Sequence, residues 1–411
     1  MGMPSAQMRE ERLSSGARAL LGLLRPAAAV DALPPRAWGD IVDLALRHGV
    51  GPLLHRALQA RGELAQLPGD AIKRLEDERR ATALDNLRNY GEFRRIARAL
   101  RERGIPVIAL KGLHLAELVY RDISLRPMSD LDILVPEAQV KPAVDLLLAS
   151  EYELDRRYAR GYDAGLTHRR LGIMVEVHWT LAEPTERYTP PIEDIWRSAP
   201  QATVGDAKTQ VMSPEFLMLH VCAHLAYQHV FAFDLRALCD IAEIVRAHPV
   251  LDWAAVADHG RRHGWTRGIA AALRLARDHL GAAVPEDALV AVGGDGLAAD
   301  ALADALEQLV TGVGISNALR NAPNLVALKS PIGWRQKVAM FWNRLFVSRA
   351  ELARIYRVSE GSARIGLFYA VRLRDLLRRY AANLREMNAH GAHLAESTAR
   401  QALLARWIDK A

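Results

Sequence analysis

The sequence of 411 residues has little cysteine and no long apolar run. Its two cysteines, Cys222 and Cys239, are too few for a disulfide framework or a site of four thiolates. No window approaches the roughly 18 uninterrupted apolar residues that cross a bilayer, and the charged N-terminus lacks the apolar segment of a signal peptide. We therefore expect a cytoplasmic protein with no transmembrane segment.

Lysine is also scarce, because only seven of the 54 basic residues are lysine. A lysine within a motif is therefore less apt to reflect general surface composition and more apt to have a specific role. Half of the residues are apolar (50%) and a quarter are charged (25%), which excludes intrinsic disorder and allows a large core. The length favours two or three domains, or one domain with large helical additions.

Basic residues gather near the C-terminus. Between residues 331 and 385, twelve Arg or Lys residues stand against three acidic ones, a net charge of +9 in a chain whose total is +6. An apolar stripe runs from Leu367 to Leu384, so we predict a packed amphipathic helix with a solvated basic face. The alternative is contact with an anionic membrane surface or with nucleic acid. Nucleic acid is less favoured because aromatic platforms for bases are lacking.

The hydrophobic pattern divides the chain into four segments. They are an N-terminal helical cap (1–103), an α/β core (104–212), a helical domain (213–325) and a basic C-terminal helical region (326–411). The helical domain is expected to begin at Ser213, a suitable N-cap before Pro214. The predicted fold class is α+β, with a small mixed β-sheet embedded in a largely α-helical protein.

Three short strands are predicted in the core, at residues 105–110, 129–135 and 172–179. Helices are expected between them. Asp130 and Asp132 are separated by one residue, so both carboxylates project from the same face of the second strand. Glu176 and His178 likewise share one face of the third strand.

The two aspartates repel each other unless a cation lies between them. Mg²⁺ prefers such hard oxygen ligands and takes further ligands from substrate phosphates. Glu176 supplies a third carboxylate if the third strand lies beside the second, and three converging carboxylates match a two-metal site. Taken singly, each motif is also compatible with a solvated strand end.

The turn at Lys111 and Gly112 lies where a strand gives way to a helix. Backbone N–H groups there can face an anion, Gly112 allows close approach, and Lys111 adds a positive charge. Arg126, four residues before Asp130, is a second candidate phosphate contact.

Together these blocks closely resemble the bacterial uncharacterised nucleotidyltransferase family of the polymerase-β-like superfamily. The resemblance covers about residues 20–270, and residues 345–351 resemble the tail of longer members. The residues that carry it are 108–112, Tyr120, 126–135, 175–179, 220–226, 235–241 and Asp252 with Trp253.

The resemblance implies a mixed sheet and transfer of a nucleoside monophosphate from an NTP, with Mg²⁺ or Mn²⁺ as cofactor. Asp130, Asp132 and Glu176 would be the catalytic metal ligands. The residues that would bind the nucleotide are Lys111, Gly112, Arg126 and His178. The acceptor, whether a small molecule, a sugar, a peptide or a protein, is left open.

The sequence departs from the superfamily at the phosphate turn. Superfamily enzymes usually carry Gly-Ser there, whereas this chain has Lys111 and Gly112, with seventeen residues between Gly112 and Asp130. Either Lys111 replaces the serine, or nucleotide binding has been altered or lost. The alternative function is therefore a non-catalytic nucleotide-binding or regulatory protein.

Two further pairs lie outside the predicted sheet. His220 and His224 are four residues apart on a predicted helix, a spacing that can bind zinc, and His229 follows. Packed histidines that line the cleft are the favoured interpretation. Arg236 and Asp240 have the same spacing. A helix-surface or interhelical ion pair is the favoured interpretation, and the positioning of a substrate group against the sheet is the alternative.

Overall fold

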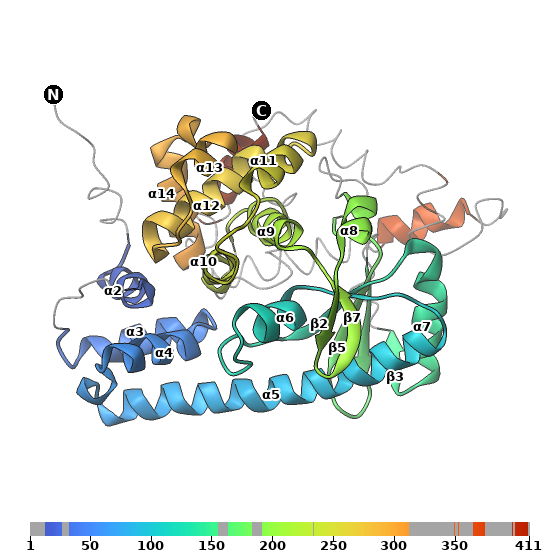
Figure 1. Ribbon diagram of the computed structural model, residues 1–411, viewed down its shortest axis with the longest axis horizontal. Helices are drawn as coiled ribbons and strands as arrows, with labels where there is room; N and C mark the ends of the chain where they lie inside the picture. The colour runs from blue at the N-terminus through green and yellow to red at the C-terminus, as the bar shows by residue number, and fades with distance from the viewer. Residues whose placement is uncertain are drawn as a thin grey trace.

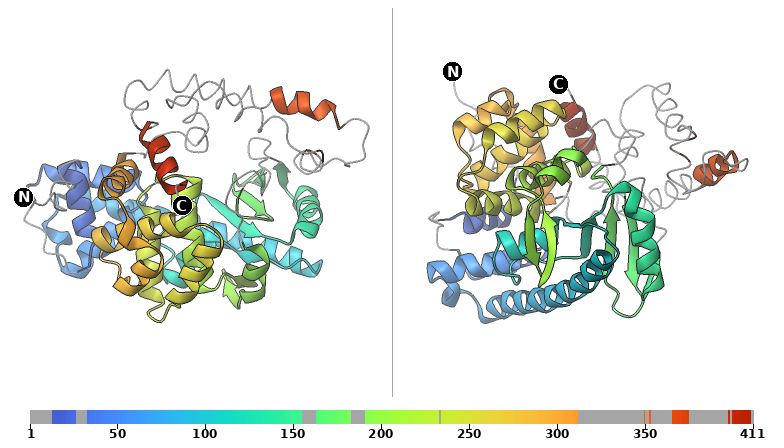
Figure 2. Two further views of the ribbon diagram at one scale, coloured as in Figure 1. Left: turned by 90° about the horizontal axis from the view of Figure 1, so that it is seen from above. Right: turned by 45° about the vertical axis from the view of Figure 1, so that its right-hand side comes forward.

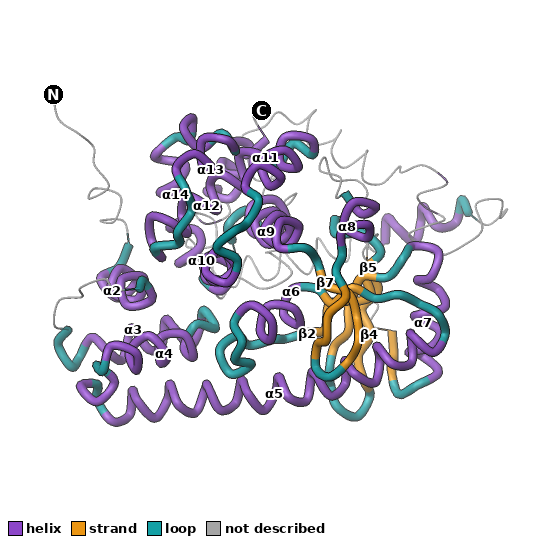
Figure 3. Tube along the Cα trace, in the orientation of Figure 1, coloured by secondary structure: helices purple, strands orange, loops and turns teal. Residues whose placement is uncertain are grey.

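The structure is a computed structural model that describes residues 13–26, 33–154, 163–182, 191–232, 234–311, 365–374 and 399–409, with residues 349, 352 and 397. A long helix, α5, runs along one side of the molecule. Helices α2–α4 lie over one end of it and the β-sheet lies over the other (Figure 1). A stack of helices, α9–α14, covers the remaining side, and Figure 3 shows the strands gathered in one place.

The elements occur along the chain in three groups. The N-terminal helices are α2 (Ser15–Leu24), α3 (Ala37–Arg47), α4 (Gly51–Arg61), the 3₁₀ turn η1 (Leu64–Gln66) and α5 (Gly69–Glu102). The sheet region comprises β1 (Ile108–Ala109), α6 (Lys111–His114), the π-helical turn η2 (Leu115–Val119), β2 (Asp130–Leu134), the 3₁₀ turn η3 (Glu137–Gln139), α7 (Val140–Ala149), β3 (Tyr152–Leu154), β4 (Asp163–His168), β5 (Met174–His178), α8 (Ile192–Ser198), β6 (Gln201–Val204) and β7 (Ala207–Val211). The later helices are α9 (Pro214–Ala223), the π-helical turn η5 (His224–Gln228), α10 (Arg236–Ala247), α11 (Trp253–Arg262), α12 (Thr266–Leu280), α13 (Glu286–Ala291), the 3₁₀ turn η6 (Gly294–Gly296) and α14 (Ala299–Thr311).

The sheet has seven strands in the order β3-β4-β5-β2-β1-β7-β6. β2 pairs in parallel with β5, and β1 pairs in parallel with β7. The other neighbouring pairs are antiparallel. The sheet is therefore mixed, and the predicted α+β fold class is confirmed.

The alternation of side chains along the central strands separates two hydrophobic cores. Leu131 and Ile133 of β2 belong to one core, which includes residues of α5 and α7. Leu134 points to the opposite face and belongs to the larger core of α2–α4 and α9–α14. Asp130 and Asp132 share this second face because alternate residues of a strand do. Figure 2 shows α5 and α7 on one side of the sheet and the helical stack beyond the other.

The 34 residues of α5 contribute to both cores. Ala71 and Leu75 near its start pack with the larger core, whereas Phe93 and Leu100 near its end pack under the sheet. Between them, Asn86 is fully buried although Leu87 is exposed. The middle of α5 therefore buries polar side chains where its ends bury apolar ones.

The predicted N-cap at Ser213 is confirmed. Its Oγ accepts a hydrogen bond from the backbone N of Phe216 at 3.4 Å, and Pro214 is the first residue of α9. The first predicted strand is shorter than expected, since β1 has two residues. Backbone hydrogen bonds from Leu110 to Asp132 and from Gln210 to Val107 continue its pairing at both ends.

Four strands were not predicted from the sequence: β3, β4, β6 and β7. The hairpin of β6 and β7 turns at Gly205 and Asp206, whose φ angles of 53° and 63° both lie in the left-handed region. Two such residues are typical of the tight turn that matches strand twist. The Gly-Asp pair was therefore a hairpin signal in the sequence.

The division into four segments stays a prediction. Most of the basic C-terminal region, 326–411, lies outside the described residues. Its last described stretch, 399–409, packs on the helical stack, where Leu404 and Ile408 join the larger core. Among the described residues no helix is both long and apolar enough to span a membrane.

Gly268 provides a test of packing in the helical stack. A Cβ there would lie 2.5 Å from Cε2 of Tyr227 and 2.8 Å from Cβ of Ala226. We expect Gly268→Ala to lower the free energy of unfolding by about 1–3 kcal/mol, because the crossing of α12 over η5 cannot widen without loss of packing. Urea unfolding measures the change.

The matched control is Gly91→Ala in α5, where a Cβ meets no atom within 4 Å. It should raise the free energy of unfolding by about 0.5–1 kcal/mol, since alanine is the better helix former. Equal effects of the two substitutions would contradict the described crossing.

Candidate functional site

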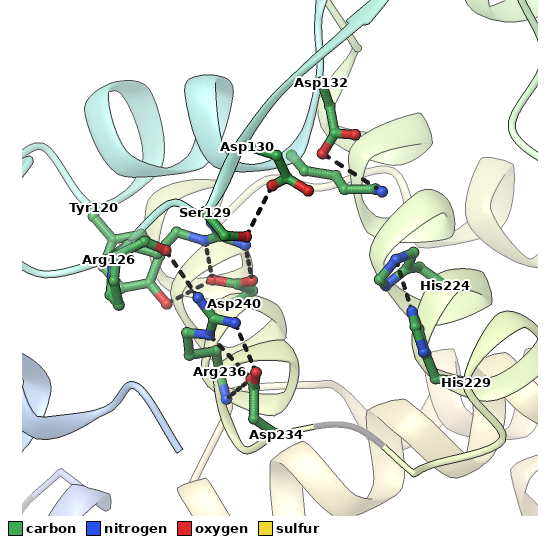
Figure 4. A network of polar contacts seen from close by, with 12 residues as sticks. Tyr120, Arg126, Ser129, Asp130, Asp132, His224, His229, Asp234, Arg236 and Asp240 are labelled. Carbon is green, nitrogen blue, oxygen red and sulfur yellow. Dashed lines mark hydrogen bonds and ion pairs between the residues drawn. The ribbon is translucent and has the colours of Figure 1, made fainter. Parts of the chain in front are cut away.

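Three carboxylates lie on the face of the sheet opposite α5. Asp130 and Asp132 come from β2, and Glu176 of β5 stands directly opposite Asp132 in the parallel register. Asp132 and Glu176 are buried, with side-chain exposures of 5% and 8%. Figure 4 shows Asp130 and Asp132 facing the helix that carries His224.

His178 links two of these carboxylates. Its Nε2 lies 2.8 Å from Oδ1 of Asp132 and 3.4 Å from Oε2 of Glu176. Burial opposes the charged form of His178, but hydrogen bonds to Asp132 and Glu176 outweigh it and raise its pKa to about 9. The imidazole is therefore a cation at neutral pH and neutralises part of the carboxylate charge.

The two aspartates differ in how readily they ionise. Burial and the neighbouring Asp132 and Glu176 raise the pKa of Asp130 to about 6. Burial also opposes ionisation of Asp132, but Lys111 and the hydrogen bond to His178 outweigh it and hold the pKa of Asp132 below its usual range. Asp132 therefore keeps its negative charge to lower pH than Asp130 does.

Lys111 lies beside Asp132 rather than in open solvent. Its Nζ is 3.5 Å from Oδ2 of Asp132, and 20% of its side chain is exposed. The backbone φ of Lys111 is 31°, in the left-handed region that residues other than glycine rarely adopt. Such strain is often kept at functional sites. The turn that begins α6 therefore directs this lysine toward the carboxylates at a cost in backbone energy.

Gly112 is required by close packing. A Cβ at this position would lie 2.7 Å from Cγ of Met128 and 3.1 Å from Nη1 of Arg126. The segment that leads into β2 thus passes directly over the turn at Lys111. Gly112 allows this approach, which brings a guanidinium to the start of α6.

Arg126 is held by a buried ion pair with Asp240 of α10. Its Nε donates to Oδ1 at 2.9 Å and its Nη2 to Oδ2 at 2.8 Å. The hydroxyl of Tyr120 also donates to Asp240, at 2.8 Å. Side-chain exposures of 13% for Arg126 and 3% for Asp240 place this pair in the interior (Figure 4).

Arg236 and Asp240 do not pair with each other, so the helix-surface alternative is wrong, whereas each residue forms an ion pair with another residue. Arg236 binds Asp234 through Nε and Nη2 at 3.1 Å and 2.7 Å, and its Nη1 donates to the carbonyl of Pro127 at 3.0 Å. Asp240 already accepts from Arg126, which is 114 residues earlier in the chain. Each arginine thus makes two hydrogen bonds to one carboxylate, which is stronger than the single contact expected of a pair on the helix surface.

The segment that carries Arg126 is also attached to α5. The Nδ2 of Asn86 donates to the carbonyls of Ile123 and Arg126, at 2.6 Å and 2.8 Å. The Nδ2 of Asn89 donates to the carbonyl of Met128 at 3.4 Å. These buried amides hold the segment between α5 on one side and α10 on the other.

Histidines of α9 and η5 form the opposite wall of the site. Burial, followed by the charge of Lys111, lowers the pKa of His220 to about 3 and places the pKa of His224 well below its usual value. Nε2 of His224 lies 3.1 Å from Nε2 of His229, so one of these rings donates to the other. Neutral, packed histidines agree with the favoured interpretation of this pair.

Two features near the site were missed from the sequence. Asp163 of β4 is buried and stands opposite His178 in the antiparallel register, so it lies on the same face as the three carboxylates. The α6 and α9 helices each continue into a π-helical turn, a rare form that is frequent at functional sites. No local sequence signal marks either feature.

The chemistry of these side chains fits a divalent cation. Carboxylate oxygens of Asp132 and Glu176 lie within 4.8 Å of each other, both residues are buried, and Asp130 is the neighbour of Asp132 on β2. Several buried carboxylates beside one lysine and one histidine would otherwise be costly. Their oxygens are the ligands that Mg²⁺ prefers.

Comparison with protein families shows the family to which the chain belongs. Residues 34–281, more than half of the chain, match the model described as "Uncharacterised nucleotidyltransferase". The chain belongs to this nucleotidyltransferase family. The matched segment contains the sheet, all of the carboxylates described above and the histidines of α9 and η5. Membership indicates a transferase that acts on nucleoside triphosphates, while leaving the reaction open.

Two other comparisons add little to the family assignment. None of the curated proteins compared with the chain matches it. A solved structure described as "tRNA-processing enzyme (apo form I)" is similar over 78% of this chain and 98% of that chain, with 13% identity and a TM-score of 0.25. So low a score gives that neighbour no weight for fold or function here.

The ion pair of Arg126 with Asp240 gives a prediction about stability. Asp240→Asn removes the charge that balances a buried guanidinium, so we expect the free energy of unfolding to fall by about 3–5 kcal/mol. Asp145→Asn is the control, because Asp145 belongs to an exposed pair with Lys141 worth about 0.5 kcal/mol or less. A loss below about 1 kcal/mol for Asp240→Asn in urea unfolding would show that Arg126 is not held in this way.

Proposed function

We propose that this protein is a Mg²⁺-dependent nucleotidyltransferase that transfers a nucleoside monophosphate from an NTP to an acceptor hydroxyl or phosphate. The acceptor belongs to a small molecule, a sugar, a peptide or a protein. The observation that carries the proposal is the set of three carboxylates, Asp130, Asp132 and Glu176, on one face of β2 and β5 beside the turn at Lys111. With only two cysteines in the chain, a cytoplasmic setting for the reaction is expected.

Asp130, Asp132 and Glu176 are the proposed metal ligands. When bound, Mg²⁺ would neutralise phosphate charge, activate the attacking oxygen and stabilise the leaving pyrophosphate. Register supports this assignment, because Glu176 faces Asp132 across neighbouring strands. His178 keeps both of these carboxylates in place through its Nε2 contacts and so orients the ligands.

Lys111, Gly112 and Arg126 are the proposed phosphate-binding groups. Lys111 approaches Asp132, and Nη1 of Arg126 lies 3.1 Å from the position that a Cβ of Gly112 would take. A lysine and a guanidinium at one turn suit the several negative charges of a triphosphate. Because Asp240 fixes Arg126, the guanidinium is oriented before the nucleotide arrives.

A second candidate function is a non-catalytic nucleotide-binding or regulatory protein. One observation favours it: the ammonium of Lys111 and the ring of His178 already compensate Asp132, at 3.5 Å and 2.8 Å. A protein that had lost its metal would keep its carboxylates neutralised in this manner. The two functions differ in whether a divalent cation displaces Lys111 from Asp132.

The decisive experiment incubates the protein with each NTP and Mg²⁺, with and without added cell extract. Mass spectrometry then searches the protein and the extract for a nucleotide adduct. Thermal unfolding is measured in parallel, since binding to the folded state alone raises its stability. Transfer supports catalysis, whereas a thermal shift without any adduct supports the non-catalytic function. No shift with any NTP at millimolar concentration contradicts both.

Asp132→Asn is the matched test of the metal site. The amide keeps the shape of the carboxylate but loses the charge that holds the ion, so metal-dependent transfer should disappear while the protein stays folded. Binding of Mn²⁺, followed by electron paramagnetic resonance, should weaken in the same variant. Asp145→Asn, at an exposed position of α7, should leave both properties unchanged. Transfer that survives in Asp132→Asn would remove this carboxylate from the mechanism.

Lys111→Ala tests the phosphate turn. Loss of a charge-assisted contact of about 1.5–3 kcal/mol should weaken NTP binding roughly ten- to a hundredfold. Lys141→Ala removes a lysine that is 80% exposed and should bind NTP like the original protein. If Lys111→Ala binds NTP normally but unfolds more easily, Lys111 serves only as the ion-pair partner of Asp132. Calorimetry with NTP and Mg²⁺ gives the affinities.

A further inference from the structure

A second group of metal-ligating side chains lies away from the carboxylates of the sheet. It consists of Asp194 on α8 and of His259 and His263 on α11, with His263 at the C-cap of that helix. The two histidines are four residues apart, which places them on the same side of α11. One donor atom from each of the three residues lies within 4.8 Å of the others.

The imidazole rings are arranged as a pair. They are nearly parallel, with an interplanar angle of 9° and centroids 6.2 Å apart. The ring of His259 packs against Phe216 at 4.5 Å, and the ring of His263 against Trp265 at 5.7 Å. Aromatic neighbours on both sides therefore hold the rings in these orientations.

One ring nitrogen of the group is available to coordinate an ion. All three residues are half-buried, and Nδ1 of His259 is buried without a hydrogen-bond partner among the described residues. The carboxylate of Asp194 accepts from Arg197, an arginine that is 74% exposed. Such a surface ion pair contributes little, so a metal ion competes with it easily.

We propose that Asp194, His259 and His263 form a zinc-binding site. Two imidazole nitrogens and one carboxylate oxygen are a ligand set that Zn²⁺ takes, with a water molecule in the fourth position. Bonds of about 2.0–2.2 Å in a tetrahedron hold ligand atoms roughly 3.4 Å apart. The three donor atoms now lie within 4.8 Å of one another, so small side-chain rotations bring them to that spacing.

The site joins parts of the chain that belong to different regions. α8 lies between β5 and β6 of the sheet in sequence, whereas α11 belongs to the helical stack. Phe216, which contacts His259, is on α9, and His220 follows it by about one helical turn. Zinc would therefore connect α8 to α11 and support the helix that forms the opposite wall of the carboxylate site. The two metal sites share no ligand.

Titration of the metal-free full-length protein with Zn²⁺ tests the proposal. We expect this site to bind one equivalent of Zn²⁺, besides the ion that the carboxylates of the sheet would take, and Co²⁺ in its place to give the strong visible absorption of a site with nitrogen ligands and few donors. His263→Gln, His259→Gln and Asp194→Asn should each weaken Zn²⁺ binding by roughly tenfold or more. Three variants are used because His259 also packs against Phe216, so its replacement alone could act through the fold.

Two controls separate this site from the carboxylates of the sheet. Asp132→Asn should keep the equivalent of Zn²⁺ that His263→Gln loses. His248→Gln, which replaces a half-buried histidine outside both groups, should bind Zn²⁺ normally. Zn²⁺ should also raise the unfolding temperature of the original protein by more than it raises that of His263→Gln. Loss of Zn²⁺ binding only in Asp132→Asn, or unchanged binding in all three ligand variants, overturns the proposal.

Discussion

The parallel pairing of β2 with β5 fixes the position of the charged groups in the candidate site. It sets Asp132 opposite Glu176 and places Asp130 and His178 on the same face. A shift of one residue would turn these groups toward the apolar packing of α5 and α7. The register is held by Leu131, Ile133, Val175 and Val177, which point to the other face and lie in the core there. Burial of one face thus determines the chemistry of the other.

Charge compensation is the second condition for this arrangement. Carboxylates with side-chain exposures of 5% and 8% are stable only with cations nearby, and Lys111 and His178 provide them. Arg126 and Asp240 likewise compensate each other's buried charge, between the sheet region and α10. Arg236 and Asp234 are two residues apart, but Lys111 with Asp132 and Arg126 with Asp240 join partners that only the folded chain brings near.

The sequence predicted those parts that depend on local patterns. The strands of Asp130 and Glu176 alternate apolar and polar residues, and Ser213 before Pro214 marks a helix start, as the structure confirms. β4 was missed because its first residues, Asp163, Ala164 and Gly165, have weak strand preference. The hairpin turn at Gly205 was overlooked although its signal was present.

Pairing between distant residues could not be predicted in this way. Local spacing pointed only to Arg236 as a named partner of Asp240, whereas the fold pairs Asp240 with Arg126. Asp194 and His259 are 65 residues apart, so nothing in either segment points to the other. Glu176 was placed beside Asp132 by a family resemblance and by strand order. The register that puts them face to face is a property of the folded sheet.

The length of α5 has a consequence for cooperativity. Its first turns belong to the larger core, its last turns belong to the core under the sheet, and its buried asparagines bind the segment that leads to Asp130. A break in the middle of the helix would free that segment and give up the hydrogen bonds of the asparagines without exposing much apolar surface. Because one continuous helix belongs to both hydrophobic cores, unfolding of one core is coupled to unfolding of the other. Amide protons on both sides of the sheet should therefore exchange with solvent as one unit.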